Sequence, residues 1–150
     1  MNAVKCVGVT KTYVQGDEII TALDHVDLEV QSGEFICFSA PSGGGKTTLL
    51  NAIGGLDIPD QGEITIGNSR IDQLSKAELA ELRLHQIGFV FQAYNLIPVL
   101  TAKENIEFVM EIRGVSSAER ENKSLRVLKE VGLAGLEERY PTDMSGGQQQ

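Results

Sequence analysis

The chain has 150 residues, of which 41% are hydrophobic and 23% are charged, an ordinary composition for a globular domain. Its formal net charge of -8 argues against binding to DNA or RNA, because nucleic-acid modules usually carry a basic face. No apolar run approaches the roughly 20 residues that span a bilayer, and no signal pattern opens the chain. We therefore expect a cytosolic domain that meets a membrane only through a partner.

The first part of the chain predicts strands. Residues 3–14 and 18–30 alternate apolar and polar side chains around a turn-like QGD, which is typical of two antiparallel strands. Residues 34–40, EFICFSA, form an apolar run that is too short for a helix, so we expect a strand buried on both faces. The two cysteines lie in apolar runs without the spacing of a metal or redox site, which predicts buried thiols.

A glycine-rich segment, SAPSGGGKTT, occupies residues 39–48 after this expected strand. Residues 46–53, KTTLLNAI, predict a helix that ends at two glycines, which completes the strand, glycine loop and helix order of a P-loop. Backbone N–H groups of such a loop surround phosphate oxygens, and the helix N-terminus attracts the anion. The residues expected to contact nucleotide phosphates are Ala40, Pro41, Ser42, Gly43, Gly44, Gly45, Lys46, Thr47 and Thr48.

Individual side chains of this loop have distinct expected roles. Lys46 would reach the β- and γ-phosphates, Thr47 would offer its hydroxyl to Mg²⁺, and Thr48 could add a hydroxyl toward the α-phosphate. Ala40 stands where the pattern GxxxxGK[ST] has its first glycine. If that position needs a positive φ, the alanine costs about 1 kcal/mol or more, and otherwise the change is nearly silent. A glycine-rich turn without a ligand is the alternative interpretation.

The second half of the chain predicts mainly helices. Residues 87–92, IGFVFQ, interrupt them as a short buried strand that ends in Gln92, and an unusually apolar loop follows. Three pairs of residues have the spacing of a capping box, in which each side chain caps the other's backbone N–H at a helix start. These pairs are Ser75 with Glu78, Thr101 with Glu104, and Ser116 with Glu119.

The motif MSGGQ at residues 144–148, together with the P-loop, resembles ATP-binding cassette (ABC) ATPases. The segments TALDHVDLEVQSGEF, TTLLNAIGGLDIPDQGEI, IGFVFQAYNLIPVLTAKENI and YPTDMSGGQQQ carry the resemblance, which is strongest to ATPase subunits of the lipoprotein-releasing and macrolide-exporter type. It implies an α/β P-loop NTPase fold, an ABC-type nucleotide-binding domain. An antiparallel β subdomain and a partial RecA-like core would fill residues 1–90 approximately, and a helical subdomain residues 91–150.

The resemblance also implies roles for residues outside the P-loop. Tyr13 matches an aromatic residue that stacks on adenine, although a tyrosine packed on the sheet surface is the alternative. Gln92 matches a glutamine that contacts Mg²⁺ or water, although it could be merely structural. The resemblance thus implies that the catalytic residues are Lys46, Gln92 and Ser145. It also implies that the metal ligands are Thr47 and Gln92. The motif residues expected to bind the γ-phosphate of ATP held by the opposite subunit of a homodimer are Ser145, Gly146, Gly147 and Gln148.

The implied function is an ATP-binding subunit that hydrolyses Mg-ATP to power export or lipoprotein release by a membrane permease, at the inner face of the cell membrane. Residues 95–100 form the apolar surface that would receive the permease, unless they pack inside the helical subdomain. The alternatives are a soluble ABC ATPase of translation or DNA repair, and a nucleotide-binding fragment without hydrolysis.

The Walker B aspartate, the catalytic glutamate and the switch histidine of the family have no counterpart before Gln150. We therefore expect a chain truncated just after the MSGGQ motif, which is the signature motif of the family, and inactive by itself. Missing neighbouring strands would leave sheet edge and core surface exposed, so we also expect marginal stability.

Overall fold

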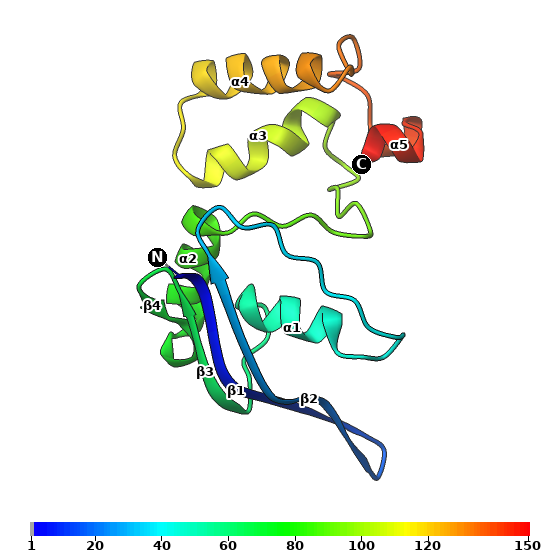
Figure 1. The fold of residues 1–150 in the computed structure, drawn as a ribbon. Coiled ribbons are helices and arrows are strands. Elements are labelled where there is room, and N and C mark those ends of the chain that lie inside the picture. Colours follow the sequence, from blue (N-terminus) through cyan, green and yellow to red (C-terminus); the bar gives the residue numbers. More distant parts are fainter. Residues whose placement is uncertain (1) are drawn as a thin grey trace. The chain divides into compact units, whose positions relative to one another are not determined.

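The computed structural model describes residues 2–150, which form two compact units, Met1–Ile87 and Gly88–Gln150 (Figure 1). The first unit is built on one antiparallel sheet with the strand order β2-β1-β3-β4. Its strands are β1 (Asn2–Gln15), β2 (Glu18–Gln31), β3 (Gln61–Ile66) and β4 (Ser69–Arg70). The alternating pattern of the first 30 residues therefore predicted the long β1–β2 hairpin correctly.

Helices complete the first unit. Helix α1 (Lys46–Ile53) has the predicted bounds and contributes Leu49 and Ala52 to the core. A 3₁₀ turn (Ile71–Gln73) and helix α2 (Lys76–Gln86) follow β4. The core is one cluster that joins the sheet to these helices, because apolar residues of both kinds of element face each other. Its buried members are Cys6, Val9, Leu23, Leu49, Ala52, Ile64, Ile71, Leu79 and Leu82.

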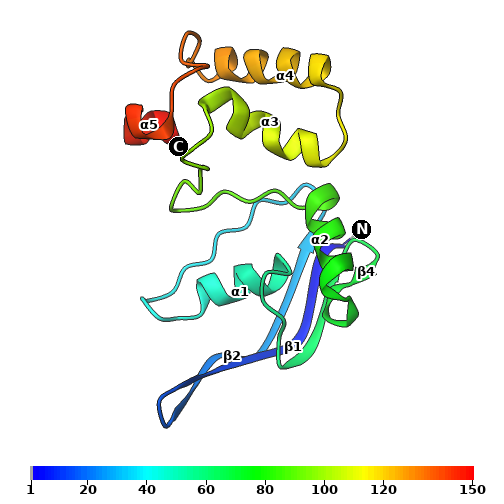
Figure 2. The same cartoon turned by 180° about the vertical axis from the view of Figure 1, so that it is seen from behind.

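The second unit is helical, as predicted. Helices α3 (Ala102–Ile112) and α4 (Ser117–Glu130) lie side by side (Figure 2), and a 3₁₀ turn (Pro141–Asp143) leads to the short helix α5 (Gly146–Gln149). A small core of Ala102, Leu128 and Met144 holds these elements together. None of the helices among residues 2–150 is long and apolar enough to cross a membrane.

Two of the three predicted capping boxes are confirmed. Ser75 with Glu78 and Thr101 with Glu104 exchange the expected hydrogen bonds at the starts of α2 and α3. The third prediction is wrong: Ser116 is the N-cap of α4 but makes no capping hydrogen bond with its side chain. The Glu119 carboxylate instead lies 2.7 Å from Lys123 Nζ, one turn further along the helix. An ion pair at this spacing therefore replaces the reciprocal box.

The two predicted buried strands at residues 34–40 and 87–92 are also wrong. Neither segment joins a ladder, and the side chains of Phe35 and Val90 are each 95% exposed. A strand needs backbone N–H and C=O groups of a neighbour, and none of the strands among residues 2–150 runs beside these segments. Cys37 is consequently exposed, contrary to expectation. Cys6 is buried as expected, and burial raises the pKa of its thiol to about 11.

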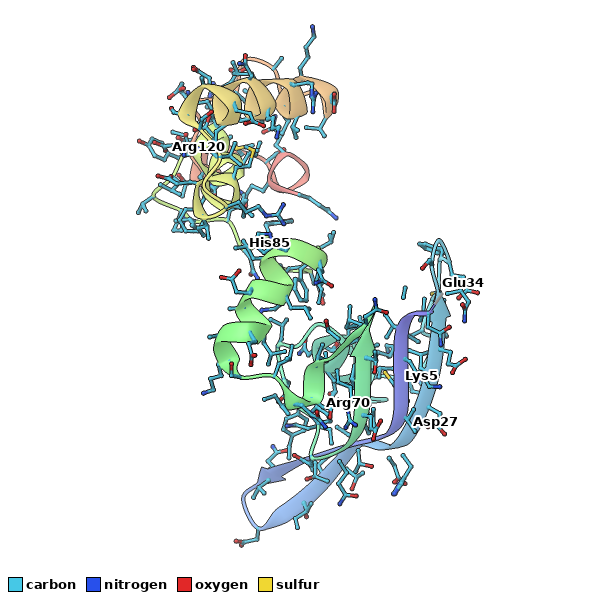
Figure 3. The ribbon with its side chains drawn as sticks, turned by 90° about the vertical axis from the view of Figure 1, so that its left-hand side faces the viewer. Lys5, Asp27, Glu34, Arg70, His85 and Arg120 are labelled. Atoms are coloured by element: carbon cyan, nitrogen blue, oxygen red, sulfur yellow. The ribbon has the colours of Figure 1, made fainter. Side chains whose placement is uncertain are left out.

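A partly buried ion pair connects β3, β4 and the 3₁₀ turn. Asp72 accepts hydrogen bonds from the Ile64 backbone N–H at 3.0 Å and from Arg70 Nη2 at 2.6 Å. Of these residues, Arg70 is labelled in Figure 3. Burial raises the pKa of Asp72, but the bonds from Arg70 and Ile64 and the Arg70 charge outweigh burial. The pKa of Asp72 therefore lies below its ordinary value.

A carboxyl whose pKa is depressed in the folded state stabilises the fold above its unfolded pKa, and loses this contribution as the pH falls through the folded pKa. We therefore expect the free energy of unfolding to fall below about pH 4, near the ordinary carboxyl pKa. Urea denaturation between pH 7 and pH 2.5 measures this fall. It should be shallower in Asp72→Asn, and an equally steep fall in the variant would contradict the assignment.

Candidate functional site

The glycine loop ends in a backbone conformation that only glycine adopts easily. Gly43 and Gly45 have φ of 80° and 74°, and Gly45 is the N-cap of α1. A Cβ built on Gly45 would collide with the backbone oxygen of Ala22 on β2. Position 45 therefore requires glycine twice over, once for its left-handed backbone and once for the close approach of the strand.

Ala40 carries no backbone strain. The only residues other than glycine with positive φ among residues 2–150 are His25 and Asn95. Ala40 precedes Pro41, and a residue before proline is pushed toward extended backbone. The sequence left open whether an alanine at position 40 strains the loop. The structure favours the interpretation in which the alanine costs almost no stability. The Ala40 methyl group lies where a side chain on Gly44 would be, 2.8 Å from a Cβ built there.

The Lys46 ammonium is held across the glycine loop. Its Nζ donates to the backbone oxygens of Ala40 at 2.6 Å and of Pro41 at 2.8 Å. An ammonium has three N–H donors, so one remains to point away from these carbonyls. A cavity of about 440 Å³ opens here, and its lining includes Ala40, Gly44, Gly45 and Lys46. A positive charge, the backbone of the glycine loop and the start of α1 therefore meet at one cavity, which suits a phosphate.

Thr47 and Thr48 occupy the first turn of α1, with Thr47 exposed and Thr48 half-buried. No group of three or more His, Cys, Asp or Glu side chains among residues 2–150 is arranged to hold a metal ion. A threonine hydroxyl that shares the ion with phosphate oxygens and water is the donor set that Mg²⁺ commonly takes. Thr47 therefore fits a metal that arrives with a nucleotide.

Tyr13 lies on β1 with 40% of its surface exposed. Its hydroxyl donates to Asp57 Oδ2 at 2.7 Å, and Lys11 Nζ lies 5.5 Å from the ring centroid. The hydrogen bond to Asp57 raises the pKa of Tyr13, while a hydrogen bond with Thr48 lowers it. The ring is thus tied to the helix that follows the glycine loop. Our sequence analysis missed Asp57, because an aspartate between a helix and a strand gives no local signal of a partner 44 residues away.

In the second unit, Ser145 and Gln148 form a capping box that the sequence analysis did not predict. The Gln148 backbone N–H donates to Ser145 Oγ at 3.4 Å, and the Ser145 N–H donates to Gln148 Oε1 at 2.9 Å. The serine hydroxyl accepts here, so its own hydrogen remains available as a donor. A Cβ on Gly147 would meet nothing within 4 Å, whereas one on Gly146 would lie 2.9 Å from the Tyr94 hydroxyl oxygen.

Residues 95–100 are held in place by one amide side chain that the sequence analysis also missed. Asn105 Oδ1 accepts from the Ile97 N–H at 2.8 Å, and Asn105 Nδ2 donates to the backbone oxygens of Ile97 and Leu100 at 3.1 and 3.0 Å. Within this loop Val99 is 76% exposed, whereas Ile97 is half-buried. The loop therefore has a defined shape and presents an apolar side chain to solvent.

The predicted site residues are divided between the two units. Tyr13 and the whole glycine loop belong to the first unit, where Thr48 and α1 bring them together. Gln92 and Ser145 belong to the second unit, and Gln92 is exposed in an irregular segment. The expected metal ligands Thr47 and Gln92 thus come one from each unit.

Residues 23–150 match the profile of the family described as ABC transporter. The chain belongs to this family. It is 48% identical to an uncharacterized ABC transporter ATP-binding protein, MJ0796, of Methanocaldococcus jannaschii, over 98% of this chain and 64% of that protein. It is 38% identical to the lipoprotein-releasing system ATP-binding protein LolD of Chromohalobacter salexigens, over 97% of this chain and 62% of that protein.

Solved structures of the family have the same fold. A dimeric structure of the ATP-binding cassette MJ0796 in a post-hydrolysis state, bound to ADP and Pi, superimposes with a TM-score of 0.91 and 45% identity. The alignment covers 97% of this chain and 65% of that one. The fold class expected from the motifs, an ABC-type nucleotide-binding domain, is therefore confirmed. This chain spans slightly less than two thirds of the relatives described here.

Replacement of Gly45 by alanine should destabilise the first unit strongly, by about 2 kcal/mol or more, because strain from positive φ adds to a collision with the Ala22 carbonyl. Gly43→Ala is the matched control: its φ is also positive, but nothing lies within 4 Å of the added Cβ. The control should lose only about 1 kcal/mol. Urea denaturation measures both, and equal losses would refute the importance of the close approach.

Ala40→Gly should lower stability slightly, by about 0.5–1 kcal/mol, because glycine adds freedom to the unfolded chain and relieves no strain in the folded one. The midpoint of urea denaturation measures the change. A rise in the midpoint would show that the alanine is strained after all.

Proposed function

We propose that this chain is the ATP-binding subunit of an ABC transporter, and that it binds Mg-ATP at the glycine loop. The observation that supports this most directly is the Lys46 ammonium held across the loop at the start of α1. A phosphate group placed there would meet the lysine charge, the backbone amides of the loop and the positive end of the helix dipole. Residues 40–48 would hold the phosphates, with Thr47 as a ligand of Mg²⁺ and Tyr13 stacked on adenine.

We further propose that two copies of the chain act as a homodimer, in which Ser145, Gly146, Gly147 and Gln148 of one copy bind the γ-phosphate of ATP held by the other. The free hydroxyl hydrogen of Ser145 and the open space at Gly147 support this role. The dimeric assembly of the related MJ0796 cassette with ADP and Pi supports it as well. Gln92 would contact the Mg²⁺ ion or the attacking water.

Hydrolysis by the full-length protein would use this chain's residues chiefly for positioning and charge. Phosphoryl transfer to water develops negative charge around the γ-phosphate, and fixed positive groups stabilise that charge. Lys46 would act in this way from its own subunit, Ser145 from the opposite subunit, and Gln92 would orient the water. Thr47 and Gln92 would hold Mg²⁺, which would supply positive charge to neutralise the phosphates.

The energy of hydrolysis would drive export or lipoprotein release by a membrane permease. The related LolD protein is named for a lipoprotein-releasing system. The loop at residues 95–100 would receive the permease, because Asn105 fixes its shape and Val99 projects an apolar side chain from it. Docking there would keep the subunit at the cytoplasmic face of the membrane.

Calorimetric titration with Mg-ATP tests the nucleotide site. Lys46→Ala should weaken binding by tenfold or more, because a hydrogen bond to a charged group contributes about 1.5–3 kcal/mol and about 1.4 kcal/mol corresponds to a factor of ten. Lys129→Ala is the matched control, because it removes the same charge from an exposed position on α4 in the other unit. Unchanged affinity in Lys46→Ala would reject the glycine loop as the phosphate site.

A further inference from the structure

A polar cluster beside α1 connects the segment after this helix to strand β1. Asp57 lies in that segment, and its backbone N–H donates to the Asn51 carbonyl at 3.3 Å. The N–H of Leu56 donates to the same carbonyl at 2.9 Å. Two hydrogen bonds thus tie the backbone around Asp57 to the last turn of α1, so the position of its carboxylate follows the position of the helix.

The two carboxylate oxygens of Asp57 have different partners, and both partners lie on β1. Oδ2 accepts the hydroxyl of Tyr13 at 2.7 Å, and Oδ1 lies 2.9 Å from Lys11 Nζ. Lys11 and Tyr13 are two residues apart on the strand, so their side chains lie on the same face of the sheet. Because the Lys11 side chain is only 13% exposed, water and salt weaken this ion pair less than they weaken a pair at the surface.

A second carboxylate fastens the same segment without touching Tyr13. Asp60 Oδ2 accepts from the Thr12 backbone N–H at 2.7 Å and from the Thr12 hydroxyl at 2.8 Å. Lys11 Nζ also donates to the Ile58 carbonyl at 2.7 Å. Residues 57–60 therefore form a strap across β1 with separable contacts, one to the Tyr13 hydroxyl and others to the strand itself.

The ionisation of the cluster agrees with this geometry. The hydrogen bond to Asp57 raises the pKa of Tyr13, so the phenol stays protonated and donates. Burial raises the pKa of Asp57, but hydrogen bonds from Tyr13 and Lys11 and the Lys11 charge outweigh burial and leave its pKa below the ordinary value. At neutral pH a charged acceptor thus holds a neutral donor, which is the stronger kind of hydrogen bond.

We propose that Asp57 is a positioning residue for nucleotide recognition: through the Tyr13 hydroxyl it holds the tyrosine ring in the orientation that receives the base. This inference rests on the proposed function, in which Tyr13 stacks on adenine. An exposed tyrosine without a partner would have to be ordered when nucleotide binds, whereas a ring ordered on folding loses no side-chain freedom at that step.

Helix α1 explains why the aspartate is well placed for this role. The helix begins at the glycine loop with Lys46, and the residue that orients Tyr13 is bonded to its last turn. Helix α1 therefore positions both the glycine loop and the Tyr13 ring. The distance between the phosphate end and the base end of a bound nucleotide is then set by the folded chain and not by two independent loops.

The test compares Mg-ATP with Mg-tripolyphosphate, a probe that has the phosphates but no base. By calorimetry, Asp57→Ala and Tyr13→Phe should each weaken ATP about three- to tenfold and leave tripolyphosphate unchanged. Asp57→Asn keeps an oxygen that accepts the tyrosine hydroxyl, so it should retain most of the ATP affinity. The double variant Asp57→Ala/Tyr13→Phe should bind ATP no more weakly than Tyr13→Phe, since that variant already removes the hydrogen bond to Asp57.

Asp60→Ala is the matched control, because it removes a strap carboxylate that bonds Thr12 and not Tyr13. It should leave the ratio of ATP to tripolyphosphate affinity as in the unmodified chain. Equal weakening of both probes by Asp57→Ala would overturn the inference and assign Asp57 a purely structural role. The urea midpoint of each variant identifies any loss of fold.

Tyr13→Ala separates this inference from the proposed function. If Tyr13→Ala weakens ATP but Asp57→Ala does not, the positioning role is rejected and the stacking role of Tyr13 stands. If Tyr13→Ala leaves ATP binding unchanged, both the stacking role and the positioning role are rejected. A loss of ATP binding in Lys46→Ala alone would then still support the phosphate site.

Discussion

The close approach of Gly45 to the Ala22 carbonyl is the contact on which the candidate site depends. It brings the start of α1 against strand β2, where no side chain larger than hydrogen fits. The next residues of the helix then point in fixed directions: Lys46 returns across the loop, and Leu49 enters the core. One steric constraint therefore couples the sheet, the helix and the phosphate loop, and the buried apolar face of α1 maintains it.

In a chain with a net charge of -8, the proposed anion site consists mostly of backbone groups. Loop amides and the dipole of α1 supply partial positive charge, and Lys46 adds one full charge oriented by two carbonyls of the loop. The acidic residues nearest to Tyr13 do not oppose this, because Asp57 and Asp60 are engaged by Lys11 and by Thr12. Local pairing is thus consistent with the proposed phosphate binding in spite of the overall charge.

The second unit uses polar side chains to shape its loops in the same way. Asn105 bonds several backbone groups of residues 95–100, and Ser145 with Gln148 closes the start of α5. In both places the side chain satisfies backbone groups that would otherwise need water, and the outward surface is left apolar or free of side chains. Such surfaces suit contact with another chain, which agrees with the homodimer and the permease contact proposed above.

The sequence by itself determined several features that depend on neighbours a few residues apart: the β1–β2 hairpin, helix α1, the boxes at Ser75 and Thr101, and the glycine loop. These follow from periodicity, hydrogen bonds between residues three apart, and glycine spacing. Tertiary structure decided the rest. Residues 34–40 and 87–92 formed no strands, because a ladder needs a partner that no apolar run can supply for itself. The bond between Asp57 and Tyr13 was likewise unpredictable, since it joins residues 44 positions apart and forms only once β1 and α1 share a core.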